Sequence, residues 1–312
     1  MNSGAKHPSS SSSFVDLHIH GAFGVDVLTA SAADMDRLAL GLAARGVSGF
    51  LPTLVPQPLV EMAPTVARLS AWIRSRHSGD GRGAQPLGIH FEGPFVSHSR
   101  CGALRRENFL EGTDARGVGA FFEIASSAPG RGMATLAPEI PGGIAVVKEF
   151  VKLGFVVSIG HTDADVAALD AALAAGARHM THFGNAMKPL HHRDVGPIGW
   201  GLQADGVTVD VIADGHHLAP EMLRLVLKAK GESRVALISD AMPAAGLADG
   251  DYAIWGETLT VKDGAARNVA GALAGSTALL DECVNRLVSI GVPADSARRM
   301  SADVPRRILD AE

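Results

Sequence analysis

Residues 154–184 have the sequence GFVVSIGHTDADVAALDAALAAGARHMTHFG, in which two apolar runs flank a helix-like segment. The apolar runs, 154–161 and 177–184, lack clean alternation, as expected for strands that are buried on both faces of a sheet. Between them, acidic residues precede and a glycine follows an Ala/Leu-rich stretch, which predicts a helix over 163–175. The stretch therefore predicts a strand–helix–strand unit with parallel strands.

The same pattern recurs along the whole chain. Together with the two above, strand-like runs occupy eight segments: 14–20, 48–54, 86–93, 132–139, 154–161, 177–184, 207–215 and 233–241. Further helices are predicted at 33–45, 58–75, 143–153 and 219–230, and two more in the closing segments 276–291 and 293–309. Eight strands with helical crossovers predict an α/β fold, a (β/α)8 TIM-type barrel. A doubly wound open sheet is the alternative, because a strand count cannot prove closure.

Three long segments follow strands at their carboxyl ends, at 94–131, 185–206 and 242–275. Barrels of this type build their sites from such loops. The last segment contains YAIWGETLTVKDGAARNVAG (252–271), which predicts a hairpin over the mouth of the barrel.

Composition limits the class of protein. The 312 residues carry a formal charge of -5 and are 46% hydrophobic, which is typical of a globular chain and gives no basic face for nucleic acid. No apolar run is long enough to cross a membrane, and the two cysteines suit a reducing compartment, so we expect a cytoplasmic protein. We expect residues 1–13, which are serine-rich, to be a disordered leader and residues 14–312 to form the barrel.

Side chains that can hold a metal ion follow the predicted strands. His18 and His20 end the first strand and, being two apart, point to the same face. Four more follow later strands: Glu92, His161, His182 and Asp240. Each one alone also fits a structural role, such as a helix-capping carboxylate or a core histidine.

Taken together, these six residues would converge on one mouth. Imidazole and carboxylate without thiolate suit Zn²⁺, Fe²⁺, Mn²⁺ or Co²⁺. A metal site with an open position can activate water, and Asp240 is then placed to act as the general base. The pattern indicates metal-assisted hydrolysis.

Other segments have residues suited to a substrate. Arg193 and His192 lie in NAMKPLHHRDVGPIG (185–199), and His216 and His217 lie in ADGHHLAP (213–220). A guanidinium and an imidazole close together suit a phosphate group, although both segments also fit solvated loops. LAGST (273–277) offers backbone N–H groups before a helix, another candidate contact for an anion or a sugar.

Several motifs resemble those of N-acetylglucosamine-6-phosphate deacetylases of the amidohydrolase superfamily. They occur in the family's order: HFEGPF, SIGHTDAD, THFGNAM…PLHHRDVGPIG, ADGHHLAP, SDAMPAAGLADGDY and GALAGSTALLD. The resemblance runs from about residue 14 to residue 309. It implies hydrolysis of the acetamide of an amino-sugar phosphate, with release of acetate.

The resemblance also implies roles for individual residues. Glu92, His161 and His182 would be the principal metal ligands, His18 and His20 would support a second ion, and Asp240 would be the catalytic aspartate. Substrate contacts would come from Asn185, Ala186, Arg193, His217, Leu273, Ala274 and Gly275. One or two divalent ions are expected in each chain.

The chain departs from the family pattern in three places. Leu104 stands where the family usually has a substrate-contacting histidine, and His98 is a nearby candidate to replace it. The small β-sandwich that the family builds from both chain ends is expected to be missing, which would expose apolar surface and favour a homodimer. Phe183–Gly184 replaces bulkier residues.

Three functions remain open from the sequence. The first is deacetylation of N-acetylglucosamine 6-phosphate. The second is action on the galactosamine epimer or on another acylamine, which Leu104 leaves open. The third is a barrel that binds sugar phosphates without turnover, which the intact set of ligand-type residues argues against.

Overall fold

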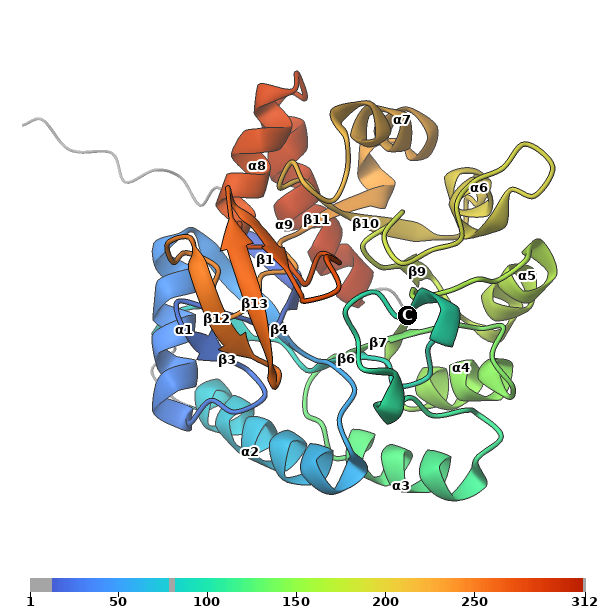
Figure 1. Cartoon of the computed structure of the whole chain (residues 1–312), viewed down its shortest axis with the longest axis horizontal. Coiled ribbons are helices and arrows are strands. Elements are labelled where there is room, and N and C mark those ends of the chain that lie inside the picture. The colour runs from blue at the N-terminus through green and yellow to red at the C-terminus, as the bar shows by residue number, and fades with distance from the viewer. Residues whose placement is uncertain (1–12, 79–81, 311–312) are drawn as a thin grey trace, which may run out of the picture.

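The computed structural model describes residues 13–78 and 82–310, which form a barrel of parallel strands surrounded by helices (Figure 1). The predicted leader lies outside these residues except for Ser13. The barrel strands, in order around the sheet, are β1 (Phe14–Ile19), β4 (Val47–Leu54), β6 (His90–Glu92), β7 (Met133–Leu136), β8 (Val156–Ile159), β9 (His179–Met180), β10 (Thr208–Ile212) and β11 (Val235–Ile238). All eight predicted strands are confirmed; seven have shorter bounds than predicted, and β4 begins one residue earlier.

Backbone contacts between the last and first strands bring the sheet nearly to closure. Ile19 and Ala241 form a parallel bridge, and Asp240 N–H donates to the carbonyl of His18 at 3.0 Å. The remaining neighbours pair in parallel along the chain order, and the short β5 (Gln85–Pro86) adds to β4. The open-sheet alternative is therefore excluded, and the predicted barrel is confirmed.

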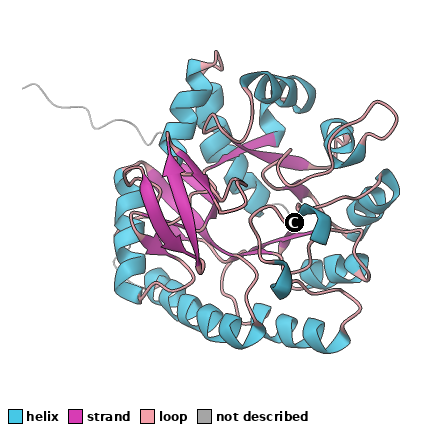
Figure 2. Cartoon of the chain, in the orientation of Figure 1, coloured by secondary structure: helices cyan, strands magenta, loops and turns pink. Residues whose placement is uncertain are grey.

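Helices form the outer ring (Figure 2). They are α1 (Ala32–Ala44), α2 (Leu59–His77), α3 (Ala115–Ala125), α4 (Gly143–Lys152), α5 (Val166–Ala175), α6 (Gly196–Gln203), α7 (Pro220–Lys230), α8 (Leu280–Ser289) and α9 (Ala294–Asp310), with short 3₁₀ turns η1 (His98–Arg100), η2 (Arg106–Asn108) and η3 (Glu232–Arg234). The sequence analysis missed α3 and α6, which lie in segments expected to be loops. Both contain two or more glycines, which lower helix propensity, so packing on the barrel rather than local preference holds them.

The barrel has a packed lower half and a polar upper half. Val15, Leu51, Met133 and Ile212 point into the interior and pack against Val304, Ile308 and Leu309 of α9, which covers the amino-terminal end of the strands. None of the helices described is long and apolar enough to cross a membrane.

Segment 242–275 forms the predicted hairpin and one strand more. β12 (Gly250–Ile254), β13 (Glu257–Lys262) and β14 (Ala265–Arg267) make an antiparallel sheet with its own small core. Figure 1 shows this sheet in orange, in front of β1 and β4. A second short pair, β2 (Gly21–Ala22) with β3 (Val25–Asp26), follows β1.

Candidate active site

Five strands bring six buried side chains to the carboxyl end of the barrel. His18 lies in β1 and His20 just after it; Glu92 is the last residue of β6; His161, His182 and Asp240 follow β8, β9 and β11 by two residues each. All six are at most 7% exposed. The structure thus brings together every metal-ligand candidate that the sequence offered.

The three residues that follow their strands have an unusual backbone. His161, His182 and Asp240 have φ angles of 47°, 31° and 50°, in the left-handed region that residues other than glycine rarely occupy. This conformation turns the chain inward just past the strand. Such backbone is held only where the surrounding structure fixes it, and it concentrates at functional sites.

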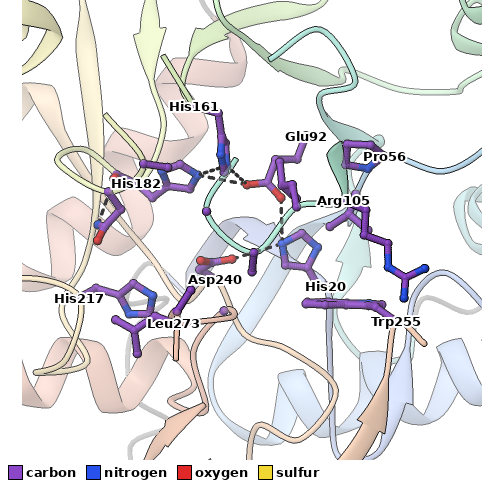
Figure 3. Close-up of a pocket in the computed structure, with 18 of the residues that line it drawn as sticks. His20, Pro56, Glu92, Arg105, His161, His182, His217, Asp240, Trp255 and Leu273 are labelled. Atoms are coloured by element: carbon purple, nitrogen blue, oxygen red, sulfur yellow. Dashed lines mark hydrogen bonds and ion pairs between the residues drawn. The ribbon is translucent and has the colours of Figure 1, made fainter. Parts of the chain in front are cut away.

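Glu92 is at the centre of the cluster (Figure 3). Its Oε1 atom lies 3.0 Å from His161 Nε2 and 3.1 Å from His182 Nε2. Its Oε2 atom lies 3.3 Å from His20 Nε2, and His18 Nε2 lies 3.6 Å from Oε1. Glu92 therefore belongs to two groups of three potential ligands, one with His18 and His20 and one with His161 and His182, and the ligand atoms in each group lie within 4.8 Å of one another.

The outer nitrogen atoms of these imidazoles test whether a metal fits. His161 Nδ1 lies 2.9 Å from the carbonyl of Arg100, and His20 Nδ1 lies 3.2 Å from the carbonyl of Thr53. A carbonyl can only accept, so each Nδ1 donates and each neutral ring presents the Nε2 lone pair to the centre. His182 Nδ1 is buried without a hydrogen-bond partner, and its Nε2 lies 3.1 Å from His161 Nε2, so this contact is satisfied only by a proton on His182 Nε2 or by a cation at the centre. The donor set fits a divalent cation.

The charges of the cluster depend on one another. Burial would raise the pKa of Glu92, but His18, His161 and His182 outweigh it and hold the pKa well below its usual range. Burial would lower the pKa of His20, but Asp240 and Glu92 raise it to about 10. Without a metal, the protein thus keeps a proton on an imidazole beside two carboxylates, and a cation would replace that positive charge.

Asp240 stands beside the second group of ligands. Its Oδ1 atom lies 3.3 Å from His20 Nε2 and 3.5 Å from His18 Nε2, and the carboxylate faces the pocket. Burial raises the pKa of Asp240, but the neighbouring His18 and His20 lower it below its usual value. An ionised carboxylate in this position can accept a proton from a water molecule in the cluster.

The sequence analysis missed a second buried carboxylate below the cluster. Asp210 in β10 is fully buried and accepts hydrogen bonds from the backbone N–H of His182 and, at 3.3 Å, from Thr181 Oγ1. It also contacts His179 Nε2 at 2.8 Å. Thr181 Oγ1 in turn lies 3.1 Å from His18 Nδ1, so Asp210 connects to both groups of ligands. The signal was available, because Asp210 is a carboxylate within a largely apolar run at 207–213.

A cavity of about 230 Å³ opens above the cluster. Among the residues that line it are the predicted contacts Asn185, Ala186, His217, Leu273 and Gly275, with Ala274 buried behind them. Arg193, by contrast, is exposed and contacts His192 at 2.6 Å, and it is not among the described residues that line the cavity. His217 thus lines this cavity, while the role of Arg193 in phosphate binding stays a prediction.

His217 is held in place by Asp214. Its Nδ1 atom lies 2.7 Å from Asp214 Oδ2, while Asp214 Oδ1 accepts from the backbone N–H groups of His216 and His217. Burial raises the pKa of Asp214, but the bond to His217 and its charge hold that pKa far below the usual range. This pairing leaves His217 Nε2 available for a ligand in the cavity.

The loop between β6 and α3 supplies one wall. Leu104 lines the cavity at the position where N-acetylglucosamine-6-phosphate deacetylases usually have a histidine. Arg105 follows it and is the only Lys or Arg among the described residues that line the cavity. His98 does not line the cavity; its ring packs on Phe109 with centroids 5.2 Å apart. The tip of the hairpin adds Trp255 and Glu257. Local sequence patterns could not identify Arg105, Trp255 or Glu257, because loop conformation brings them to the mouth.

Comparison with known proteins adds independent evidence. Residues 12–299 match the model of the amidohydrolase family. An N-acetylglucosamine-6-phosphate deacetylase from Bacillus subtilis is 39% identical over 86% of this chain and 67% of its own length. An N-acetylgalactosamine-6-phosphate deacetylase from Escherichia coli O157:H7 is 35% identical over 96% of this chain and 78% of its own.

A solved structure shares the architecture. It is a variant of N-acetyl-D-glucosamine-6-phosphate deacetylase from Mycobacterium smegmatis in complex with N-acetyl-D-glucosamine-6-phosphate. It has a TM-score of 0.86 and 32% identity, and the match covers 96% of this chain and 77% of that one.

Proposed function

This chain belongs to the amidohydrolase family, and we propose that it is an enzyme that hydrolyses the acetamide of N-acetyl-D-glucosamine 6-phosphate to acetate and D-glucosamine 6-phosphate. One observation carries the proposal most strongly. Glu92, with two imidazoles on each side, and Asp240 line a single cavity together with His217. That arrangement suits hydrolysis of an amide attached to an anionic sugar.

Metal binding is assigned to the two groups that share Glu92. His161 and His182 with Glu92 would hold the principal ion, and His18 and His20 with Glu92 would hold a second. Zn²⁺, Fe²⁺, Mn²⁺ and Co²⁺ all suit these ligands. A bound divalent cation polarises a carbonyl group and makes a water molecule more acidic.

Asp240 would move the proton. It accepts a proton from the attacking water and later donates it to the amine nitrogen, because an amine leaves an amide only when it is protonated. The carboxylate is ionised at neutral pH, since His18 and His20 lower its pKa, so it is ready for the first step. Its position between His20 and the cavity suits transfer to a substrate atom above the cluster.

The sugar phosphate would bind with its phosphate near His217 and the Asn185–Ala186 segment. His217 Nε2 is available there, and Leu273 and Gly275 line the same cavity, with Ala274 behind them. Arg193 is proposed as a further phosphate contact. It lies on the exposed part of the segment that begins with Asn185 and Ala186 and is not itself among the described residues that line the cavity.

The galactosamine epimer is a second candidate substrate. The relative from Escherichia coli that carries this name is 35% identical and covers nearly the whole chain. The two hexosamines differ only in the configuration of one hydroxyl group. Purified protein should therefore be assayed for acetate release from both phosphates, with and without added Zn²⁺, Mn²⁺ or Co²⁺.

The decisive variant is Asp240→Asn, which preserves size and removes the capacity to accept a proton. We expect the variant to retain bound metal and substrate affinity while kcat falls by roughly 10²–10⁴. Asp251→Asn, on the exposed strand β12, is the matched control and should be fully active. Turnover of Asp240→Asn near the wild-type rate would overturn the mechanism. Absence of acetate release from either phosphate in metal-loaded wild type would favour a binding protein without turnover.

The cellular setting is part of the proposal. Cys101 and Cys283 are both free, which suits the reducing cytoplasm that the sequence analysis predicts.

A further inference from the structure

The cavity has two ends of different chemistry, with the ligand cluster between them. Figure 3 shows His217 and Leu273 on one side of Glu92 and Asp240, and Pro56 and Trp255 on the other. Asn185 also lines the cavity, and its amide donates to the carbonyl of His182. Val55, the neighbour of Pro56, also lines the cavity. The first end is therefore polar. The second combines the apolar side chains of Val55, Pro56 and Trp255 with the guanidinium group of Arg105, which Figure 3 shows beside Pro56.

Trp255 forms the wall of the second end. It lies at the tip of the β12–β13 hairpin, and its ring packs edge-on against His20 with centroids 5.4 Å apart. Its φ angle is 54°, and Gly256 follows with 75°. Two-residue hairpin turns with two positive φ angles favour asparagine, aspartate or glycine, so a tryptophan here is held against its local preference. The residue's contact with His20 and its place in the cavity account for holding it there.

The phosphate and the acylamino group of the proposed substrate lie on opposite sides of its sugar ring, so they can occupy opposite ends of the cavity. In a hexosamine 6-phosphate the phosphate is attached through C5, and the acylamino group is attached to C2, directly across the six-membered ring. The amide is planar and trans, so its acyl chain continues away from the ring. If the phosphate lies near His217 and the scissile carbonyl near Glu92, the acyl chain points toward Trp255.

We propose that Val55, Pro56 and Trp255 form an acyl subsite, in which Trp255 limits the substrates to N-acyl hexosamine phosphates with a short acyl chain. The inference rests on the proposed deacetylase function and on the phosphate end assigned to His217. The acetyl methyl group contacts apolar side chains there, which removes it from water. A longer chain meets the indole ring, which packs against His20.

The test is a series of substrates that differ only in chain length. N-acetyl, N-propionyl and N-butyryl hexosamine 6-phosphates would be compared by kcat/KM in wild type, Trp255→Ala and Trp255→Phe. One methylene in an apolar pocket changes kcat/KM by roughly 10–200-fold. We expect wild type to prefer acetyl, and Trp255→Ala to raise the butyryl-to-acetyl ratio at least tenfold, with Trp255→Phe in between.

Two controls separate this role from others. Tyr252→Ala disturbs the core of the same hairpin without touching the cavity and should leave the ratio unchanged. Metal content, measured by elemental analysis, should be equal in all variants. If Trp255→Ala lowers kcat for every chain length equally and leaves the ratio unchanged, or if Tyr252→Ala shifts the ratio as much, the acyl subsite is refuted. Failure of wild type to release any acid from all three substrates would instead refute the proposed function itself.

Discussion

At the scale of single residues, the centre depends on buried carboxylates that imidazoles compensate. Glu92 is 4% exposed, and an ionised carboxylate at that depth is costly without positive partners. Four imidazoles lie within 3.6 Å of it, and two of them have outer nitrogen atoms on backbone carbonyls. The geometry is therefore fixed before any ion binds, which lowers the cost of binding one.

Asp210 should control metal affinity although it touches no ion. In Asp210→Asn, one carboxylate oxygen is replaced by an amide N–H₂ group, which cannot accept a hydrogen bond. The hydrogen bonds that Asp210 accepts from the backbone of His182 and from Thr181, which contacts His18, are then weakened or lost. Loss of such an outer partner typically costs 10–100-fold in metal affinity. We expect that loss for Zn²⁺, measured by competition with a chromophoric chelator.

A control for this experiment is Asp170→Asn. Asp170 accepts from Trp200 Nε1 at 2.8 Å on the outer ring of helices, away from the cluster. Its variant should bind metal as wild type does. Wild-type affinity in Asp210→Asn would show that the Asp210 contacts are structural only.

At the scale of elements, the candidate site residues lie at the carboxyl ends of strands, and the helices around the barrel contribute to its stability. Helix α7 illustrates the second point, because its last residue, Lys230, is 2% exposed and donates to the carbonyl of Ala204 at 2.6 Å. Burial lowers the pKa of Lys230 to about 8, with a further contribution from Arg234. The charged form is therefore less favourable in the folded protein than in the unfolded chain.

This difference predicts a pH-dependent stability. The folded pKa of about 8 lies below the unfolded value of 10.5, so the unfolded chain binds more protons between these values. Below pH 8 the lysine is charged in both states, so the full free-energy cost of burying its charge is present. This cost disappears as the pH rises toward 10.5. Relative to Lys230→Met, wild type should gain about 1–2 kcal/mol of unfolding free energy between pH 7 and 10, a figure reduced for solvent screening.

Urea unfolding at both pH values would measure that gain. Lys228→Met, on the exposed side of the same helix, should show no such trend. If the difference in unfolding free energy between wild type and Lys230→Met is the same at both pH values, the lowered pKa of Lys230 is contradicted.

At the scale of the whole molecule, the cluster joins strands that are far apart in sequence. The ligand candidates come from β1, β6, β8 and β9, which span residues 14–180. An ion bound to them should therefore stabilise the barrel against global unfolding by about 4 kcal/mol when its concentration is a thousand times its dissociation constant.

Removing the metal should lower thermal stability without unfolding the protein. A chelator should lower the thermal midpoint, while circular dichroism at neutral pH stays unchanged, because protonated His20 balances the carboxylates. Adding back Zn²⁺ should restore the midpoint. Equal midpoints before and after chelation, with metal loss verified by elemental analysis, would count against a metal bound by these residues.

The predicted homodimer is also a property of the whole molecule. Leu190 is 50% exposed and Val269 is 83% exposed, and both lie in segments that follow barrel strands. We expect light scattering to report a dimer. The double variant Val269→Glu, Leu190→Glu should weaken that dimer. A monomer in wild type at high concentration would reject the dimer.

The sequence by itself determined the element order and the chemistry available at the strand ends. Buried parallel strands give continuous apolar runs, and helix ends carry local signals, such as the Asp165 side chain that caps α5. For the same local reason, Glu92, His161, His182 and Asp240 could be placed at strand ends, and the barrel fold implied that they meet.

Only the tertiary structure decided which other side chains join them. Asp210 reaches the cluster through register across β9 and β10, Trp255 through the fold of a hairpin from the far end of the chain, and Arg105 through a loop. Arg193 does not line the cavity, although Asn185 and Ala186 at the start of the same segment do. Local patterns fix backbone state and burial, whereas distances between side chains depend on barrel closure and loop conformation, which arise from contacts between residues far apart in sequence.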